Sequence, residues 1–387
     1  METEKLYYAD PFLREFTASV LSCEAGKGGF QVVLDRTAFY PEGGGQPADR
    51  GTLGNARVTD VQERDGVIFH TCDKFVENGA VSGALDWARR FDHMQQHSGE
   101  HILSGILCAR HHCDNVGFHM GADTVTIDYN ADISWEQVLE AEQEANEIIW
   151  ADRPVEISYP SPQALAALDY RSKKALTGQV RIVTFPEADC CACCGTHVAR
   201  AGQVGLIKAL SVQKFREGVR IEILCGQRAL RFLSTVYEQN RAVAQALSVK
   251  PENTASAVER TLSELHSAKV RGAELEEAAN LALAREYAGQ GDVLLIRPPM
   301  APESVRRLAD AVAKESGGLA AVFAGEGGKG HLCKYNYALV QPEGRDIAPL
   351  IKAMNAALHG RGGGRNGFAQ GSAETRQEEI EAFWAGR

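Results

Sequence analysis

Residues 92–108 read DHMQQHSGEHILSGILC, and the interpretation of the whole chain starts from this stretch. Its apolar residues, among them Ile102 and Ile106, recur at helical spacing on a mostly polar segment, which predicts a helix. His97 and His101 are four residues apart, so they share one face of that helix and can reach a single ion. Two histidines at this spacing are also common on helix surfaces, so the pair alone is weak evidence for a metal site.

A second pair of metal-binding residue types has the same spacing further along the chain. Cys193-Cys194-Gly195-Thr196-His197 offers a thiolate and an imidazole four residues apart. Both pairs together supply three nitrogens and one sulfur, a donor set that suits a tetrahedral zinc ion. The predicted zinc ligands are therefore His97, His101, Cys193 and His197.

Cysteines crowd around the second pair. The chain has ten cysteines, and four of them lie in the run Cys190-Cys191-Ala192-Cys193-Cys194. In a cytosolic chain such crowding indicates metal chemistry rather than disulfides, and adjacent cysteines are poor partners for one bridge. The C-x-x-C pairs Cys190/Cys193 and Cys191/Cys194 also fit a separate structural zinc or an oxidisable dithiol, so the choice of sulfur ligand stays open.

The patterns on either side predict a multidomain α+β protein. Residues 1–90 contain short β-prone runs separated by glycine turns, which favour a small β-barrel. Residues 91–235 alternate helices and strands and hold the predicted zinc ligands, residues 236–287 favour long helices or a solvated connector, and residues 288–387 predict an α/β domain.

Composition excludes several protein classes. Hydrophobic residues make up 44% and charged residues 24% of the 387 residues, as in soluble globular proteins. No apolar run approaches the roughly 20 residues that span a bilayer, and the start of the chain has no basic segment leading into an apolar one, so we expect a cytoplasmic protein. The net charge of −10 argues against general nucleic-acid coating but leaves room for a local basic patch.

At this point the sequence resembles a known family. The His97/His101 and Cys193/His197 pairs resemble the editing domain of alanyl-tRNA synthetase and, more closely, the free-standing AlaX proteins. Matching segments are Phe39–Gln46 with its three glycines, Val116–Gly121 and Gly202–Lys208. Gly362-Gly363-Gly364-Arg365 with Ala369-Gln370-Gly371 resembles the C-terminal domain of the synthetase, so the resemblance covers nearly the whole chain and implies the long AlaX type.

The resemblance implies a function. It implies hydrolysis in trans of mischarged tRNA(Ala), chiefly the seryl form, with the glycyl form as a second candidate, and a possible homodimer through the C-terminal half. Two other functions stay open at this stage: a non-catalytic tRNA-binding protein with a structural zinc, and a zinc hydrolase for another ester or amide. Whether zinc takes part in the chemistry or only shapes the pocket also stays open.

The resemblance further implies three catalytic residues. It places His119 close to the metal pocket, where the imidazole could orient water or a substrate hydroxyl. Thr37 and Gln46 flank the glycine-rich loop, which the resemblance directs towards the editing pocket, and their side chains could hydrogen-bond a serine hydroxyl. A structural histidine and a simple tight turn are the alternative interpretations of these segments.

Overall fold

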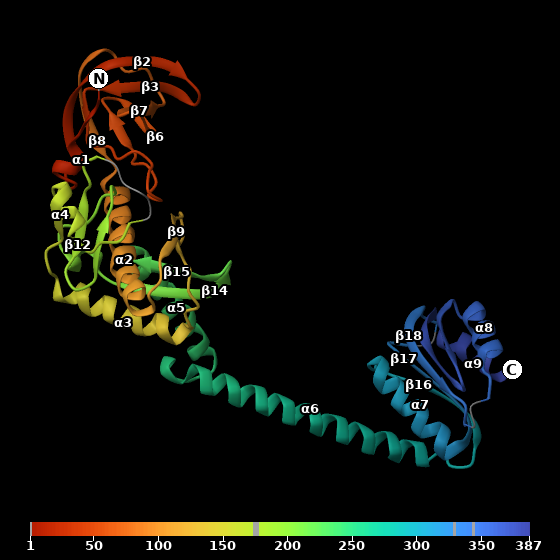
Figure 1. Cartoon of the computed structure of the whole chain (residues 1–387). Helices are drawn as coiled ribbons and strands as arrows, with labels where there is room; N and C mark the ends of the chain where they lie inside the picture. Colours follow the sequence, from red (N-terminus) through yellow and green to blue (C-terminus); the bar gives the residue numbers. More distant parts are fainter. Residues whose placement is uncertain (1, 173–177, 328–329, 343–344) are drawn as a thin grey trace. The chain divides into compact units, whose positions relative to one another are not determined.

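A computed structural model describes residues 2–172, 178–327, 330–342 and 345–387, and its elements are labelled in Figure 1. The chain divides into two compact units, Met1–Ala242 and Val243–Arg387. Both units combine helices with sheets, which confirms the predicted multidomain α+β class.

The first unit begins with a closed ring of antiparallel strands. Alternate residues of β2 (Glu15–Gly26) are buried, as expected for a strand with one face on a core. The strands pair in the order β2, β3 (Gly29–Leu34), β7 (Val67–Cys72), β6 (Ala56–Arg64), β5 (Gly51–Leu53) and β8 (Gly79–Leu85), and β8 returns to β2. The short elements β1 (Glu4–Lys5), α1 (Leu6–Ala9) and β4 (Arg36–Thr37) accompany this barrel.

Helix α2 (Trp87–His111) is the central element of the unit and carries the predicted histidine pair. Asp86 caps its first turn by accepting a hydrogen bond from the Arg89 N–H, and His112 ends it in the left-handed conformation. A Cβ added at Gly105 would lie 2.1 Å from the backbone oxygen of Ala188, so only glycine permits the helix to approach this closely. Almost every residue from Arg90 to Cys108 is buried, which explains a helix without a distinct polar face.

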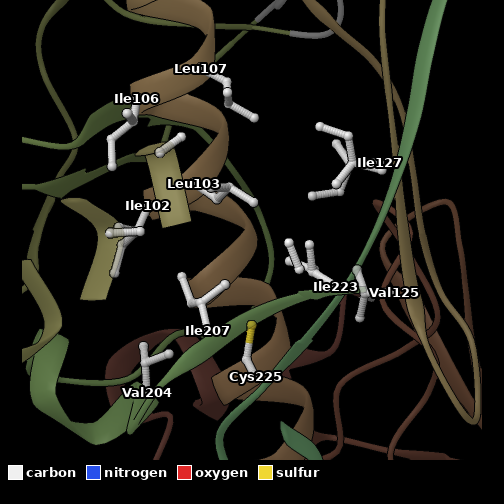
Figure 2. Close-up of a cluster of buried hydrophobic side chains, with 14 of the residues drawn as sticks. Ile102, Leu103, Ile106, Leu107, Val125, Ile127, Val204, Ile207, Ile223 and Cys225 are labelled. Carbon is white, nitrogen blue, oxygen red and sulfur yellow. The ribbon is translucent and has the colours of Figure 1, made fainter. Parts of the chain in front are cut away.

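Two sheets and a helix enclose α2. The larger sheet has the order β14 (Ile207–Phe215), β15 (Gly218–Cys225), β10 (Val125–Tyr129) and β9 (Asn115–Met120), and the smaller one has β11 (Glu156–Ser158), β12 (Ile182–Phe185) and β13 (Asp189–Ala192). Helix α3 (Trp135–Ala151) begins after Ser134, which forms a capping box with Gln137. Figure 2 shows side chains of α2 and of β10, β14 and β15 pointing into one shared core. The unit also contains α4 (Pro162–Ala166) and the 3-10 turn η1 (Ala201–Val204).

A buried arginine joins the barrel to α2. The Arg90 side chain is fully buried and donates to the Asp49 carboxylate and to the backbone oxygens of Pro11 and Ala38. Three separate segments of the N-terminal region therefore meet at the first turn of the helix. Since a buried charge is tolerated only when it is paired, this ion pair determines how the barrel sits on α2.

The second unit is an α/β domain preceded by a long helix. Helices α5 (Gly226–Ala246), at the end of the first unit, and α6 (Thr254–Arg285), with the turn η2 (Pro251–Asn253) between them, occupy the region without strand signals. The sheet has the order β16 (Gly291–Arg297), β17 (Gly317–Gly325), β18 (Cys333–Val340), β20 (Phe368–Thr375) and β19 (Gly360–Arg365). It packs with α7 (Pro302–Ser316), α8 (Ala348–Ala357) and α9 (Gln377–Ala385) around two apolar clusters.

Among the helices described here, none combines the length and the apolar character that crossing a bilayer requires.

Candidate metal centre

The two residue pairs recognised in the sequence come together in the first unit. His97, His101, Cys193 and His197 form a group in which the potential ligand atoms all lie within 4.8 Å of one another. Both histidines of the first pair come from α2, and the second pair lies just after β13. The three imidazole rings are 4.6–5.2 Å apart between centroids, and the Cys193 sulfur lies 3.5 Å from His97 Nε2. The four side chains are therefore close enough for one ion, and their role as zinc ligands stays a prediction.

The Gln46 side chain orients His97. His97 Nδ1 lies 2.9 Å from Gln46 Oε1, which also accepts the Thr196 N–H at 3.2 Å, while Gln46 Nε2 donates to the Thr196 hydroxyl at 2.9 Å. An amide oxygen can only accept, so Nδ1 of His97 carries a proton and Nε2 is the atom that faces the Cys193 sulfur. This is the arrangement in which proteins hold a metal-binding histidine.

Asp189 does the same for His101. His101 Nδ1 donates to the Asp189 carboxylate at 2.7 Å, and Arg171 holds both oxygens of that carboxylate at 2.7 Å. Burial alone would raise the pKa of Asp189, but His101 and Arg171 bring it below its ordinary value, so the carboxylate stays ionised. Because Nδ1 of His101 is held by Asp189, Nε2 is the atom that would bind an ion.

His197 provides the test of whether the group fits a metal. Its side chain is buried, and neither Nδ1 nor Nε2 has a hydrogen-bond partner in the described part of the chain. Burial lowers the pKa of His197 to about 3, so the ring is neutral and retains a lone pair. A buried polar group without a partner is costly, and an ion coordinated by the ring would remove that cost at the nitrogen that binds it.

Cys193 has the properties of a thiolate ligand. Burial raises the pKa of its thiol, but the neighbouring imidazoles of His97, His197 and His101 more than offset this and bring the pKa well below the ordinary value. The Gly195 N–H donates to the sulfur at 3.3 Å. A Cβ at Gly195 would lie 2.1 Å from His97 Cε1, so the turn can close over the histidine only with glycine at this position.

The other cysteines of the run lie differently. Cys194 is exposed and Cys190 is partly buried, and neither belongs to the group of four. Cys191 forms a smaller group with His101 and Asp189, but that carboxylate already holds Arg171 and His101. All ten cysteines are free thiols.

The three predicted catalytic residues are in different surroundings. Gln46 contacts His97, as described above. The Thr37 hydroxyl lies in the barrel, 2.9 Å from His70 Nε2, and accepts the Phe39 N–H at 3.1 Å. His119 lies on β9 with an exposed side chain. It belongs to neither of the groups of potential metal ligands among the described residues, so its role stays a prediction.

Several residues of the site were missed in the sequence. Phe118, the neighbour of His119 on β9, stacks on His97 with centroids 5.1 Å apart, and Phe185 stacks on His101 at 5.8 Å. Asp189 and Arg171 were missed as well. Only Asp189 carried a signal, because it directly precedes the cysteine run.

The glycine-rich loop explains why Gln46 reaches the site. Gly44 and Gly45 have φ values of 61° and 86°, and a Cβ at Gly45 would lie 2.5 Å from the ring of Phe118. Gly45 also accepts a hydrogen bond from the Met120 N–H. The loop therefore packs directly on β9 and carries Gln46 from the barrel to α2.

We expect Gln46→Leu to weaken zinc binding by roughly 10- to 100-fold, because His97 Nδ1 loses its acceptor. Gln46→Glu restores an acceptor oxygen and is expected to recover most of the affinity. Zinc competition against a chromophoric chelator measures both variants. Equal zinc affinity in Gln46→Leu and the unaltered protein would contradict this role.

Family models match separate parts of the chain. Residues 4–89 match the model described as tRNA synthetases class II (A), and residues 180–222 match that of the threonyl and alanyl tRNA synthetase second additional domain. Residues 293–385 match the DHHA1 domain. The chain is 33% identical to the alanyl-tRNA editing protein AlaX-L of Pyrococcus horikoshii, over 97% of this chain and 96% of that protein. The chain belongs to the AlaX family.

Alanyl-tRNA synthetases are related to this AlaX-family chain over part of their length. The alanine–tRNA ligase of Pyrococcus abyssi is 32% identical over 99% of this chain, which spans 43% of the ligase. That of Halobacterium salinarum is 38% identical over 68% of this chain and 30% of the ligase. The family expected from the sequence motifs is thereby confirmed.

Proposed function

We propose that this protein hydrolyses the aminoacyl ester of mischarged tRNA(Ala), chiefly the seryl form and secondarily the glycyl form. The observation that carries the proposal is the buried group of three imidazoles and one thiol, found in a chain whose AlaX-L relative is named an alanyl-tRNA editing protein. Because its relatives are a tRNA-editing protein and tRNA ligases, we also assign this protein to the cytoplasm.

His97, His101, Cys193 and His197 would hold a zinc ion, which fits both the donor set and the unpartnered His197. When bound, zinc supplies a Lewis acid that polarises a carbonyl or activates water. Gln46 and Asp189 each hold Nδ1 of one ring, so that Nε2 of His97 and of His101 would be the atoms that bind the ion. The rings of Phe118 and Phe185 stack on His97 and His101.

Substrate selection requires a polar group that matches the serine hydroxyl. A site built for a hydroxyl discriminates against alanine because its polar groups stay unpaired when the hydroxyl is missing. We assign this contact to Thr37 and the orientation of water to His119; to fill these roles the Thr37 hydroxyl must turn from His70 and the His119 side chain must turn from the exposed face of β9. Gln46 is the residue that positions His97. Thr37→Val tests the assignment through the ratio of seryl to alanyl hydrolysis, which is expected to fall.

The deciding assay measures zinc content together with deacylation of seryl-, glycyl- and alanyl-tRNA(Ala). We expect about one zinc per chain and hydrolysis of the seryl ester well above that of the alanyl ester. Zinc with tRNA binding but without faster hydrolysis would instead identify a non-catalytic tRNA-binding protein. Ester hydrolysis that uncharged tRNA(Ala) does not inhibit would identify a hydrolase for another substrate.

We further propose four functional regions: a barrel domain at 1–90, the editing domain at 91–235, a helical connector at 236–287 and a C-terminal domain at 288–387. In this scheme the C-terminal half contributes tRNA contacts and a homodimer interface. Arg361 and Arg365 on β19 are the candidates for tRNA backbone contacts.

A chain ending at Ala242 is expected to keep its zinc and to lose at least about 10-fold in affinity for tRNA, with a smaller salt dependence. The reason is that all four predicted ligands lie in the unit Met1–Ala242, which has its own core. Zinc analysis and tRNA titration at two salt concentrations measure both effects. Unchanged tRNA affinity together with an unchanged oligomeric state would contradict the role of the second unit.

A further inference from the structure

A cavity in the first unit lies beside α2, one turn before His97. Its volume is about 810 Å³. It is lined by the loop after Gln46, the first turns of α2, the end of β9 and the start of α5. His93 lines it and precedes His97 by four residues, or about 6 Å along the helix. None of the four predicted zinc ligands lines this cavity, so it is a separate site close to the metal centre.

Arginines dominate the lining. Arg50, Arg89, Arg228 and Arg231 face only two carboxylates, those of Asp92 and Asp123. The Asp92 carboxylate is already taken, because Arg228 binds it at 2.6 Å and also donates to the Gly121 carbonyl at 2.8 Å. The Asp92 carboxylate therefore fixes Arg228 at the wall of the cavity and is not available to pair with the other arginines.

The other three arginines of the lining have few or no partners for their side chains. Within the described residues, the side chains of Arg50 and Arg231 form no ion pair or hydrogen bond, and Arg89 uses Nε to reach the Ala48 carbonyl at 3.1 Å. Burial and, after it, the nearby charge of Arg50 lower the pKa of Arg89. Arg89 is partly buried, whereas Arg50 and Arg231 are exposed at the edge of the cavity. A bound anion would reduce the repulsion among these positive charges.

A buried histidine adds an independent observation. His93 is 1% exposed, and its Nδ1 atom has no hydrogen-bond partner among the residues of the described chain. Unsatisfied polar atoms are rare in protein interiors, because each costs free energy unless a ligand or water satisfies it. The cavity therefore combines unpaired arginines with an unsatisfied imidazole in its wall.

We propose that this cavity binds a phosphate group, namely the 5′-phosphate of the terminal adenosine whose ribose carries the aminoacyl ester. The second part of the proposal rests on the proposed deacylase function. The phosphate and the acylated hydroxyl belong to one nucleotide, and the cavity lies one helical turn from His97. A phosphate held by Arg50 and Arg231 would therefore position the ester close to the metal centre.

The first experiment measures binding without catalysis. We expect the full-length protein to bind 5′-AMP at least about 10-fold more tightly than adenosine in calorimetric titrations, since charge-assisted hydrogen bonds to phosphate are strong. The double variant Arg50→Gln, Arg231→Gln is expected to lose that difference, whereas Arg64→Gln, an exposed arginine on β6, retains it. AMP and adenosine binding equally to the unaltered protein would overturn the phosphate site, and inorganic phosphate binding as tightly as AMP would overturn the assignment to a nucleotide.

The second experiment measures hydrolysis of 3′-O-seryl-adenosine with and without a 5′-phosphate. The phosphate is expected to lower KM about 10-fold in the unaltered protein and to have no effect in the double variant, with kcat and zinc content unchanged. If the 5′-phosphate lowers KM equally in the unaltered protein and in the double variant, the proposed position of the ester is overturned. If the zinc-loaded protein hydrolyses neither compound, the deacylase function fails, while the AMP titration still decides the phosphate site.

Discussion

Replacing Cys193 by serine is expected to reduce bound zinc from about one ion per chain to a small fraction and to lower deacylation by more than roughly 100-fold. The thiolate is the one sulfur in the group of four, and its pKa is already brought down by the surrounding imidazoles. A serine hydroxyl does not ionise at neutral pH and is a poor zinc ligand. Metal analysis and the seryl-tRNA(Ala) assay on the same preparation measure both effects.

Two neighbouring cysteines are the matched controls. Cys194→Ser changes an exposed side chain and is expected to leave zinc and activity unaltered. Cys191→Ser tests the smaller group with His101 and Asp189, and it too should retain zinc. The reverse pattern, with zinc lost in Cys191→Ser and kept in Cys193→Ser, would contradict the predicted ligand set. His97→Ala and His101→Ala are expected to lose zinc and activity together.

Asp49→Ala is expected to destabilise the first unit by roughly 3–5 kcal/mol, the largest stability effect that we expect from a single substitution. Asp49 is the one carboxylate that pairs with Arg90 among the residues that the structure describes, and both side chains are buried. Without it a charged guanidinium would remain in the interior with two carbonyl acceptors alone. Because the pair joins the barrel to α2, the loss also loosens the loop that carries Gln46.

Calorimetry measures the effect through the unfolding transition of the first unit, which must be resolved from that of the second because two units need not unfold together. The control is Glu140→Gln, which removes an exposed partner 3.9 Å from Arg110 and is expected to cost less than about 0.5 kcal/mol. Equal stability of Asp49→Ala and Glu140→Gln would show that Arg90 does not need its carboxylate.

Local patterns were sufficient for part of this structure. The helix that carries His97 and His101 follows from apolar spacing, and the start of α3 follows from Ser134 as its cap. The glycine-rich run at 360–365 is a different case. The structure contains the edge strand β19 there, paired with β20. Backbone hydrogen bonds alone make that pairing, so the side-chain pattern contains no sign of it.

His119 and Thr37 illustrate the limit of motifs. A resemblance can mark a segment, but the direction of each side chain depends on the neighbouring elements. On β9 adjacent side chains point to opposite faces, and Phe118 occupies the face on His97. In the barrel, the hydroxyl of Thr37 contacts His70, a residue 33 positions away.

The amino-acid order alone predicted that His97 and His101 can reach one ion, because a four-residue spacing on a helix places two side chains on one face whatever surrounds them. Only the tertiary structure decided what holds those ligands: Gln46 is 51 positions from His97 and Asp189 is 88 positions from His101. The same is true of the arginine-lined cavity, which unites the barrel, α2 and α5. Contacts between distant segments arise from the packing of whole elements, and no short-range periodicity records them.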